Sequence, residues 1–427
     1  MDMNALYQHY LKFPSVQTDT RKLKAGDIFF ALKGPSFNGN HYAKQALDAG
    51  ASLCVLDEAP GFEDDRIMLT SDALQTLQQL ALTHRKQFNI PFIAVTGSNG
   101  KTTTKELIHA VLSSTHKTYT TEGNLNNHIG IPLTILKIRK DAEIAVIEMG
   151  ANHQKEIEGY CTYALPTHGL ITNCGKAHLE GFGGVEGVRK GKGELFDYLR
   201  NHQGTAFIFS DYDYLHEMSK GIASVKKYGT KGDGLEIEGN IASDSGLLEV
   251  AITGGITAMN IRTQLVGGYN LPNVLAAVCI GKTFHVPEDK MKAALEAYTP
   301  SNSRSQLMEV NSNKIILDAY NANPSSMKVA IENFAAMPGN NKVLMLGAMM
   351  EMGEESEAEH SALVELINRY NWKDVVLVGA QFQEVAGKHH YFANVSGAKD
   401  WFREQNFREG LILIKGSRSM QMEKVLD

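Results

Sequence analysis

The segment VTGSNGKTTT at residues 95–104 combines residue types that are typical of phosphate binding. Small and glycine residues let backbone N–H groups surround phosphate oxygens, and a helix N-terminus adds partial positive charge. Lys101 can reach the outer phosphates, and the Thr102 hydroxyl can bind Mg²⁺. The loop is a tight GxxGKT form, with Val95 where the common GxxxxGK form has glycine. Because an apolar strand precedes it and a helix follows, we expect a nucleotide phosphate loop rather than a chance glycine turn.

Two more side chains are candidates for the same site. Glu148 ends the apolar segment AEIAVIEMG, and His178 follows the apolar segment HGLITNCG. The carboxyl ends of parallel strands meet at one edge of a sheet, so we expect both near the loop. Glu148 is a candidate Mg²⁺ ligand, although a solvated or structural role is the alternative for each residue alone. Lys192, in GVRKGKGELF, has the pattern of a surface lysine, and nothing in the sequence prefers it to Lys190.

The length and the order of elements predict an α/β fold in three domains. The chain has 427 residues, and at about 150 residues per domain this suggests roughly three. Residues 1–85 mix short strands and helices, namely GDIFFALKG with a turn at Lys33-Gly34, HYAKQALDAGA, SLCVLD and DALQTLQQLALTHRKQF. Residues 86–299 alternate strands and helices, which predicts a parallel sheet, and become glycine-rich and strand-like over 205–268. Beyond Pro300, residues 300–427 contain four apolar strands, KIILDAY, KVLMLG, DVVLVGA and LILIKG, which predict a Rossmann-like domain.

Composition narrows the class of protein. Apolar residues make up 43% and charged residues 21%, as in globular proteins. A net charge of −6 disfavours a nucleic-acid partner. The sequence has no run of about 18 apolar residues and no basic start followed by an apolar run, so we expect neither membrane insertion nor a signal peptide. The four cysteines lie far apart without a CxxC pair, which favours a reduced, cytoplasmic enzyme.

The segments TGSNGKTTTKE, TEGNLNNHIGIPLTIL, VIEMGANHQKEI, ITNCGKAHLEGFG, GYNLPNVLAA, LDAYNANPSSM and KGSRSM occur in this order. Together with TDTRKLKAGDIFFALKG near the start, they resemble the Mur ligases of peptidoglycan synthesis over nearly the whole chain. GANHQKEI and NANPSSM favour the last ligase of that series over its three siblings. The resemblance implies ATP-dependent amide ligation in cell wall biogenesis, on which cell shape and cell division depend. The expected substrates are UDP-N-acetylmuramoyl-tripeptide and D-alanyl-D-alanine, and we expect the chain to act as a monomer.

The resemblance also implies domain roles and residue roles. Residues 1–85 would bind the UDP substrate, residues 86–299 would bind ATP, and residues 300–427 would close over the site. The ATP site would comprise Gly97, Ser98, Asn99, Gly100, Lys101, Thr102, Thr103, Asn270, Asn273, Arg304 (at the γ-phosphate) and Asp318 (at the ribose). Two Mg²⁺ ions would be held by Thr102, Glu148, His178 and a carbamoylated Lys192. Thr20, Arg21, Asn38 and Gly39 would bind the uridine diphosphate, and Asn126 and Asn127 would face the sugar peptide. Lys101, Lys192, His178 and Arg304 would be the catalytic residues.

Some positions depart from the family pattern, and some questions stay open. Thr20 stands in TDTR where DSR is commoner, Asn38 lacks the carboxylate of DGH-type motifs, and Tyr269 replaces a frequent histidine. The sequence identifies neither the third residue of the tripeptide, diaminopimelate or lysine, nor the base that deprotonates the amine. A related amide ligase, such as an earlier Mur ligase or a folylpolyglutamate synthetase, is one alternative. A nucleotide-dependent switch or structural ATPase without ligation is the other.

Overall fold

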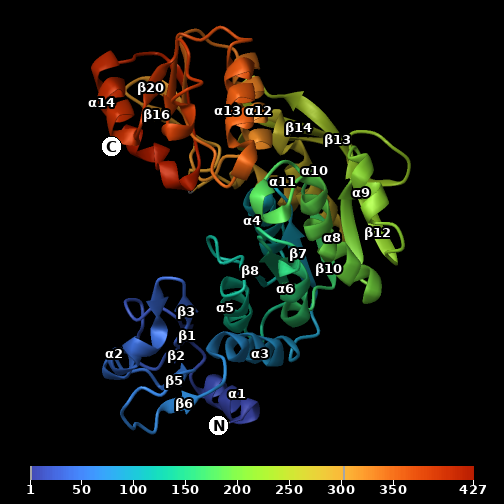
Figure 1. Ribbon diagram of the computed structural model, residues 1–427. Helices are drawn as coiled ribbons and strands as arrows, with labels where there is room; N and C mark the ends of the chain where they lie inside the picture. Colours follow the sequence, from blue (N-terminus) through green and yellow to red (C-terminus); the bar gives the residue numbers. More distant parts are fainter. Residues whose placement is uncertain (1, 302) are drawn as a thin grey trace.

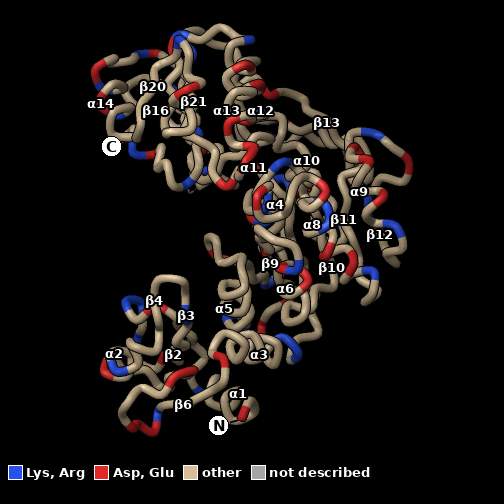
Figure 2. Tube along the Cα trace, viewed as in Figure 1, with Lys and Arg blue, Asp and Glu red and all other residues tan. Residues whose placement is uncertain are grey.

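Three main sheets follow one another along the chain in the computed structural model, which describes residues 2–301 and 303–427. Figure 1 shows the N-terminal and C-terminal sheets at opposite ends of the molecule, with the central sheet between them. Figure 2 shows both signs of charge spread over all three parts. Within the described residues, no helix has the length and apolar character needed to cross a membrane.

The N-terminal sheet is parallel, in the order β1-β2-β5-β6. Its strands and the neighbouring elements are β1 (Val16–Gln17), β2 (Ile28–Phe30), β3 (Lys33–Gly34), β4 (Phe37–Asn38), β5 (Leu53–Leu56), β6 (Ile67–Leu69), α1 (Met3–Lys12), α2 (Ala43–Asp48) and α3 (Ala73–Arg85). The predicted strands and helices of this region are confirmed, but the turn predicted at Lys33-Gly34 is wrong. Those two residues form β3 and pair with β4, so the chain reverses one step later, between Gly34 and Phe37.

The central sheet has nine strands in the order β15-β14-β13-β12-β11-β10-β7-β9-β8. Its strands are β7 (Phe92–Thr96), β8 (Thr118–Thr120), β9 (Ile144–Glu148), β10 (His168–Ile171), β11 (Thr205–Phe209), β12 (Ser224–Gly229), β13 (Leu235–Ser243), β14 (Leu247–Gly254) and β15 (Met259–Val266). From β8 across to β13 every pair is parallel, as predicted. The glycine-rich part adds β14 and β15 antiparallel, so the sheet is mixed rather than purely parallel.

Helices cover both faces of the central sheet, since a parallel sheet is apolar on both sides. They are α4 (Lys101–Ser113), α5 (Gly130–Lys137), α6 (Glu156–Ala164), α7 (Leu179–Phe182), α8 (Val185–Asn201), α9 (Asp213–Met218), α10 (Leu271–Thr283) and α11 (Glu288–Ala297). On one face α4 packs with α10 and α11, and on the other α8 packs with α6.

The C-terminal sheet has six strands in the order β16-β17-β21-β18-β19-β20, parallel except for the pair β16-β17. Its elements are β16 (Gln306–Val310), β17 (Asn313–Asp318), β18 (Lys342–Gly347), β19 (Asp374–Val378), β20 (His390–Phe392), β21 (Leu411–Lys415), α12 (Pro324–Ala336), α13 (Ser356–Ile367) and α14 (Val395–Gln405). The four predicted strands are β17, β18, β19 and β21, and each is almost wholly buried. The edge strands β16 and β20 lack a continuous apolar run and were not predicted.

A buried arginine at the end of α3 helps to join the N-terminal part to the central part. Arg85 donates from Nε to the Ala164 carbonyl (2.9 Å), from Nη2 to the Leu165 carbonyl (2.9 Å) and from Nη1 to the Phe88 carbonyl (2.8 Å). Its guanidinium carbon also lies 3.6 Å from the centre of the Phe92 ring. These contacts tie α3 to the C-terminal end of α6 and to the start of β7.

We predict that Arg85→Met destabilises the protein by about 3 kcal/mol, because it removes the donor of one buried and two partly buried carbonyls. Urea unfolding followed by circular dichroism measures the change. The exposed neighbour Lys86 provides the control, since Lys86→Met should leave the midpoint unchanged. An Arg85→Met midpoint equal to that of the unaltered protein would contradict this account.

Candidate active site

The carboxyl ends of three neighbouring parallel strands open into one large cleft. Strands β7, β9 and β10 end at Thr96, Glu148 and Ile171, and the loops that follow them form one wall of a cavity of about 730 Å³. The C-terminal part supplies the facing wall. Among the predicted site residues, those that line the cleft are Ser98, Asn99, Gly100, Lys101, Thr102, Thr103, Asn126, Asn127, Glu148, His178, Asn270, Asn273, Arg304 and Asp318.

The predicted phosphate loop lies between β7 and α4, and its two glycines are required by its shape. Gly97 has a φ of +140°, and a Cβ there would lie 2.0 Å from the Thr172 hydroxyl. Gly100 has a φ of +79° and directly precedes α4. Both values favour glycine, because side chains rarely adopt this region. The loop therefore closes tightly at the N-terminus of a helix of 13 residues.

Lys101 lies folded over the loop. Its ammonium donates to the carbonyl oxygens of Gly97 (2.7 Å) and Ser98 (3.2 Å). Burial lowers the pKa of Lys101 to about 8; Glu148 opposes this shift, and the positive charge of Arg304 adds to it. An anion bound between Lys101 and Arg304 would relieve this strain between like charges.

Glu148 is buried at the end of β9, with its carboxylate held from two sides. The Thr102 hydroxyl donates to it at 2.9 and 3.1 Å, and the Asn126 amide donates to Oε1 at 2.7 Å. A carboxylate beside a hydroxyl, facing a cleft, offers the hard oxygen donors that Mg²⁺ prefers. The residues present at Thr102 and Glu148 thus fit a magnesium ion.

The structure separates Lys192 from Lys190, which the sequence did not. Lys192 is fully buried within α8, whereas Lys190 on the same helix is exposed. The Lys192 ammonium donates to the Ala151 carbonyl at 2.8 Å and lies 4.7 Å from the centre of the Phe182 ring. Burial lowers the pKa of Lys192 well below its usual value, and the charge of Lys101 lowers it further. Lys192 lies behind the cleft residues rather than among those that line the cavity.

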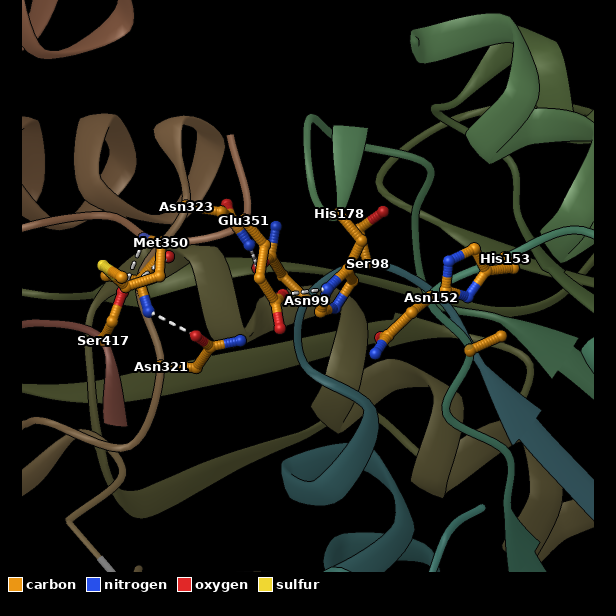
Figure 3. Close-up of polar contacts among 12 residues, drawn as sticks. Ser98, Asn99, Asn152, His153, His178, Asn321, Asn323, Met350, Glu351 and Ser417 are labelled. Carbon is orange, nitrogen blue, oxygen red and sulfur yellow. Dashed lines mark hydrogen bonds and ion pairs between the residues drawn. The ribbon is translucent and has the colours of Figure 1, made fainter. Parts of the chain in front are cut away.

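Side chains of the C-terminal part bond directly to the loops of the central part (Figure 3). The Asn323 amide, at the N-cap of α12, donates to the side-chain oxygen of Asn99 at 2.7 Å. The Lys176 backbone N–H donates to the Ser325 hydroxyl at 2.9 Å. His178 and Glu351 form a hydrogen-bonded pair, and this hydrogen bond lowers the pKa of the Glu351 carboxyl.

Arg304 and Asp318 reach the cleft from the C-terminal side. The Arg304 guanidinium carbon lies 3.4 Å from the centre of the Tyr320 ring. Asp318, at the end of β17, accepts from the buried Lys415 ammonium at 2.6 Å and from the Ser305 N–H at 3.2 Å. Tyr320 and Lys415 also line the cleft.

Asn270 and Asn273 form a buried amide pair beside the phosphate loop. Asn273 donates to the Asn270 side-chain oxygen at 2.9 Å, and Asn270 donates to the Val266 carbonyl at 2.9 Å. The Thr104 hydroxyl of α4 donates to Asn273 at 3.0 Å. The pair therefore buttresses the start of α4 as well as lining the cleft.

The four residues expected at a uridine diphosphate site lie in the N-terminal part and do not line this cleft. Thr20 and Arg21 follow β1, where the exposed Arg21 guanidinium pairs with Asp19 at 2.8 Å. Asn38, which ends β4, donates to Glu58 at 2.8 Å. A Cβ at Gly39 would lie 2.5 Å from the Leu32 carbonyl oxygen, so only glycine fits there.

Sequence reasoning missed Tyr320, Asn323, Glu351 and Lys415. A signal existed for Lys415, because a lysine that ends a buried strand lies at the ligand edge of its sheet. Tyr320 and Asn323 stand in LDAYNANPSSM, where the resemblance gave a role to Asp318 alone. Nothing in the sequence places Glu351 against His178, since 173 positions separate them.

Comparison with known proteins gives three family matches that follow one another along the chain. They are the Mur ligase family catalytic domain over residues 12–96, the Mur ligase middle domain over 95–281, and the Mur ligase glutamate ligase domain over 303–418. UDP-N-acetylmuramoyl-tripeptide–D-alanyl-D-alanine ligase from Bacillus subtilis is 35% identical, and its counterpart from Escherichia coli is 36% identical. In both cases the match covers 96% of this chain and 92% of the relative.

Solved structures agree with the sequence matches. A structure of MurF from Acinetobacter baumannii has a TM-score of 0.87 at 29% identity and covers 96% of this chain and 92% of that one. MurF ligase from Thermotoga maritima, solved with ADP, has a TM-score of 0.86 at 27% identity and covers 97% of both chains. A folylpolyglutamate synthase from Mycobacterium tuberculosis shares the fold at 15% identity, with a TM-score of 0.64 over 82% of this chain and 93% of that one. With its three consecutive domain matches and relatives aligned over almost their whole length, the chain belongs to the Mur ligase family.

Proposed function

We propose that this chain is an ATP-dependent amide ligase that joins D-alanyl-D-alanine to UDP-N-acetylmuramoyl-tripeptide for peptidoglycan synthesis. The observation that carries the proposal is the cleft in which Lys101 and the Thr102–Glu148 pair face Arg304 and Asp318 from the opposite sheet. A switch ATPase needs the phosphate loop, but it has no need of a second sheet that presents cations to it. The relatives that align with this chain from end to end are ligases with these substrates.

The chemistry requires two steps. Displacing oxide from a carboxylate is prohibitive, so the terminal phosphoryl group of ATP first passes to the tripeptide carboxylate and gives an acyl phosphate and ADP. The amine of D-alanyl-D-alanine then attacks the acyl carbon, and phosphate leaves. Both steps gather negative charge, and catalysis is therefore mainly positioning and electrostatic stabilisation.

The predicted ATP-site residues take the following roles in this scheme. Lys101 and Arg304 hold the phosphates from opposite walls, and Asp318 accepts from the ribose. Thr102, Glu148 and His178 would hold Mg²⁺, which supplies charge neutralisation at the transferring phosphoryl group. Asn270 and Asn273 border the base and ribose. Gly97, Ser98, Asn99, Gly100 and Thr103 surround the phosphates with backbone N–H groups.

The UDP substrate would extend from the N-terminal part toward the cleft. Thr20, Arg21, Asn38 and Gly39 would bind the uridine diphosphate, and Asn126 and Asn127 would face the sugar peptide. Asn126 donates a hydrogen bond to the Glu148 carboxylate, which we propose as a ligand of Mg²⁺. A peptide that contacts Asn126 would therefore lie beside the reacting phosphate. We propose that the enzyme acts as a monomer. We also propose that the reaction occurs in the cytoplasm, in keeping with the four free, buried cysteines.

Lys192 would be carbamoylated. A buried lysine with a lowered pKa is available as the neutral amine, which adds to CO₂ and releases one proton. The carbamate turns a cation into an anion with oxygen donors for Mg²⁺. Burial against Ala151 and Phe182 fits this assignment, because a permanent ammonium at that position is costly.

The proposed function is tested by phosphate release with UDP-N-acetylmuramoyl-tripeptide and ATP, with and without D-alanyl-D-alanine. We expect release that depends on both substrates and a ligated product by mass spectrometry. Lys101→Ala should abolish turnover without unfolding the protein, because the loop contributes little to the core. ATP hydrolysis that is indifferent to the dipeptide would support the switch ATPase instead.

The pKa of Lys101 predicts proton uptake when nucleotide binds. With a pKa of about 8, Lys101 is half protonated in the free protein at pH 8, and bound phosphates raise this pKa. The Lys101 contribution to proton uptake on ADP binding should therefore be larger at pH 8 than at pH 6.5. Calorimetry in two buffers of different ionisation enthalpy measures the uptake. Lys101→Arg should abolish it, since arginine stays charged, and equal heats in both buffers for the unaltered protein would refute the assignment.

Lys192→Ala should be nearly inactive, because it removes a proposed ligand of Mg²⁺. A short carboxylate such as acetate should restore part of the activity by supplying oxygens at the same place. The matched control is Lys190→Ala on the exposed face of α8, which should have little effect. Near-normal turnover of Lys192→Ala, or a larger loss in Lys190→Ala, would disprove the carbamate role.

A further inference from the structure

The backbone around Arg304 is held in an unfavourable conformation. Ser303 and Ser305 have φ values of +55° and +46°, in the left-handed region that non-glycine residues seldom adopt. Such a conformation persists only where surrounding contacts hold it. At Ser305 those contacts are the N–H bond to Asp318 at 3.2 Å and a hydroxyl contact with Tyr269 at 3.1 Å.

Tyr269 and Asp318 lie in different parts of the protein, so the Arg304 segment is anchored on both sides. Tyr269 directly precedes the Asn270–Asn273 pair of the central part, whereas Asp318 ends β17 of the C-terminal sheet. Both Tyr269 and Asp318 line the cleft. The Tyr269 hydroxyl therefore fixes the backbone next to Arg304 relative to the nucleotide loop.

The Arg304 side chain is fixed by a second tyrosine. Its guanidinium carbon lies 3.4 Å from the centre of the Tyr320 ring, and that of Arg418 lies 5.9 Å from the same ring. Stacking on an aromatic face sets the plane of a guanidinium while leaving its N–H groups at the edge free to donate. Arg304 is thus oriented before any anion arrives.

We propose that Tyr320 and Tyr269 are positioning residues that together aim Arg304 at the terminal phosphate of ATP. Tyr320 sets the plane of the guanidinium, and Tyr269 sets the position of its backbone through Ser305. This inference rests on the proposed function, which assigns Arg304 to that phosphate. The two tyrosines should affect nucleotide affinity selectively, because an oriented Arg304 can stabilise only a nucleotide that has the terminal phosphate.

The experiment compares the affinity of the protein for ADP with its affinity for a non-hydrolysable ATP analogue, both with Mg²⁺, by calorimetry. Tyr320→Leu should lower the affinity for the analogue about fivefold, because a cation–π contact is lost. The affinity for ADP should fall less than about twofold. Tyr269→Phe should lower the affinity for the analogue about threefold, because one hydrogen bond is lost. Tyr320→Phe keeps the ring and should retain the affinity of the unaltered protein.

Tyr370 supplies the matched control, because it is a tyrosine of the C-terminal part that packs on Trp372 outside the cleft. Tyr370→Leu should leave both affinities unchanged. Melting temperatures of all variants show whether any loss reflects unfolding rather than orientation. Equal weakening of ADP and the analogue by Tyr320→Leu, or an unaltered analogue affinity in Tyr269→Phe, would overturn the two-tyrosine assignment.

Arg304→Ala separates this inference from the proposed function. If it weakens ADP and the analogue equally, the assignment of Arg304 to the terminal phosphate fails, and the inference fails with it. If Arg304→Ala lowers only the affinity for the analogue, and the tyrosine variants leave that affinity unchanged, only the positioning role of the tyrosines is overturned. The double variant Arg304→Ala with Tyr320→Leu should bind the analogue no more weakly than Arg304→Ala, since Tyr320 acts through Arg304.

Discussion

The carboxyl ends of parallel strands from two sheets face one another across one cleft, and the rest of the arrangement depends on this constraint. Loops that follow parallel strands gather at one edge, so β7, β9 and β10 bring side chains that are far apart in the sequence to one place. The C-terminal sheet does the same with β17 and β21, which end at Asp318 and Lys415. Neither edge alone holds both the phosphate loop and Arg304.

Among the described residues, three cations line this cleft, Lys101, Arg304 and Lys415, together with three carboxylates, Glu148, Glu156 and Asp318. Lys415 is neutralised by Asp318 at 2.6 Å. Lys101 is bonded to neutral carbonyls, and its pKa is lowered mainly by burial, with a smaller contribution from the charge of Arg304. A polyanion bound between the two sheets would contact Lys101 on one wall and Arg304 on the other. A ligand that contacts both walls binds best when the walls face each other, and this differential affinity is what couples ligand binding to domain orientation.

The sequence predicts features that contiguous residues form, and it does not predict contacts between residues that are far apart in the chain. The phosphate loop was identified from contiguous residues, because strand, glycines, lysine and helix are adjacent in the chain. The buried strands of the C-terminal sheet were predicted from their apolar runs, whereas β16 and β20, at the edges, carry no such run. Lys192 and Lys190 could not be told apart, because the choice depends on how α8 rotates against the sheet. That rotation is fixed by packing, as a Cβ at Gly191 would lie 2.4 Å from the Phe182 ring.

Two of the residues missed by sequence reasoning, Asn323 and Glu351, make contacts that join the two walls. Asn99 is part of the phosphate loop, yet its side chain bonds to Asn323, 224 positions away at the cap of α12. Lys101 meanwhile occupies the loop carbonyls at Gly97 and Ser98. The phosphate loop and the cap of α12 therefore share one short path of hydrogen bonds, so the contact that seats α12 on the central part is made at the phosphate loop itself.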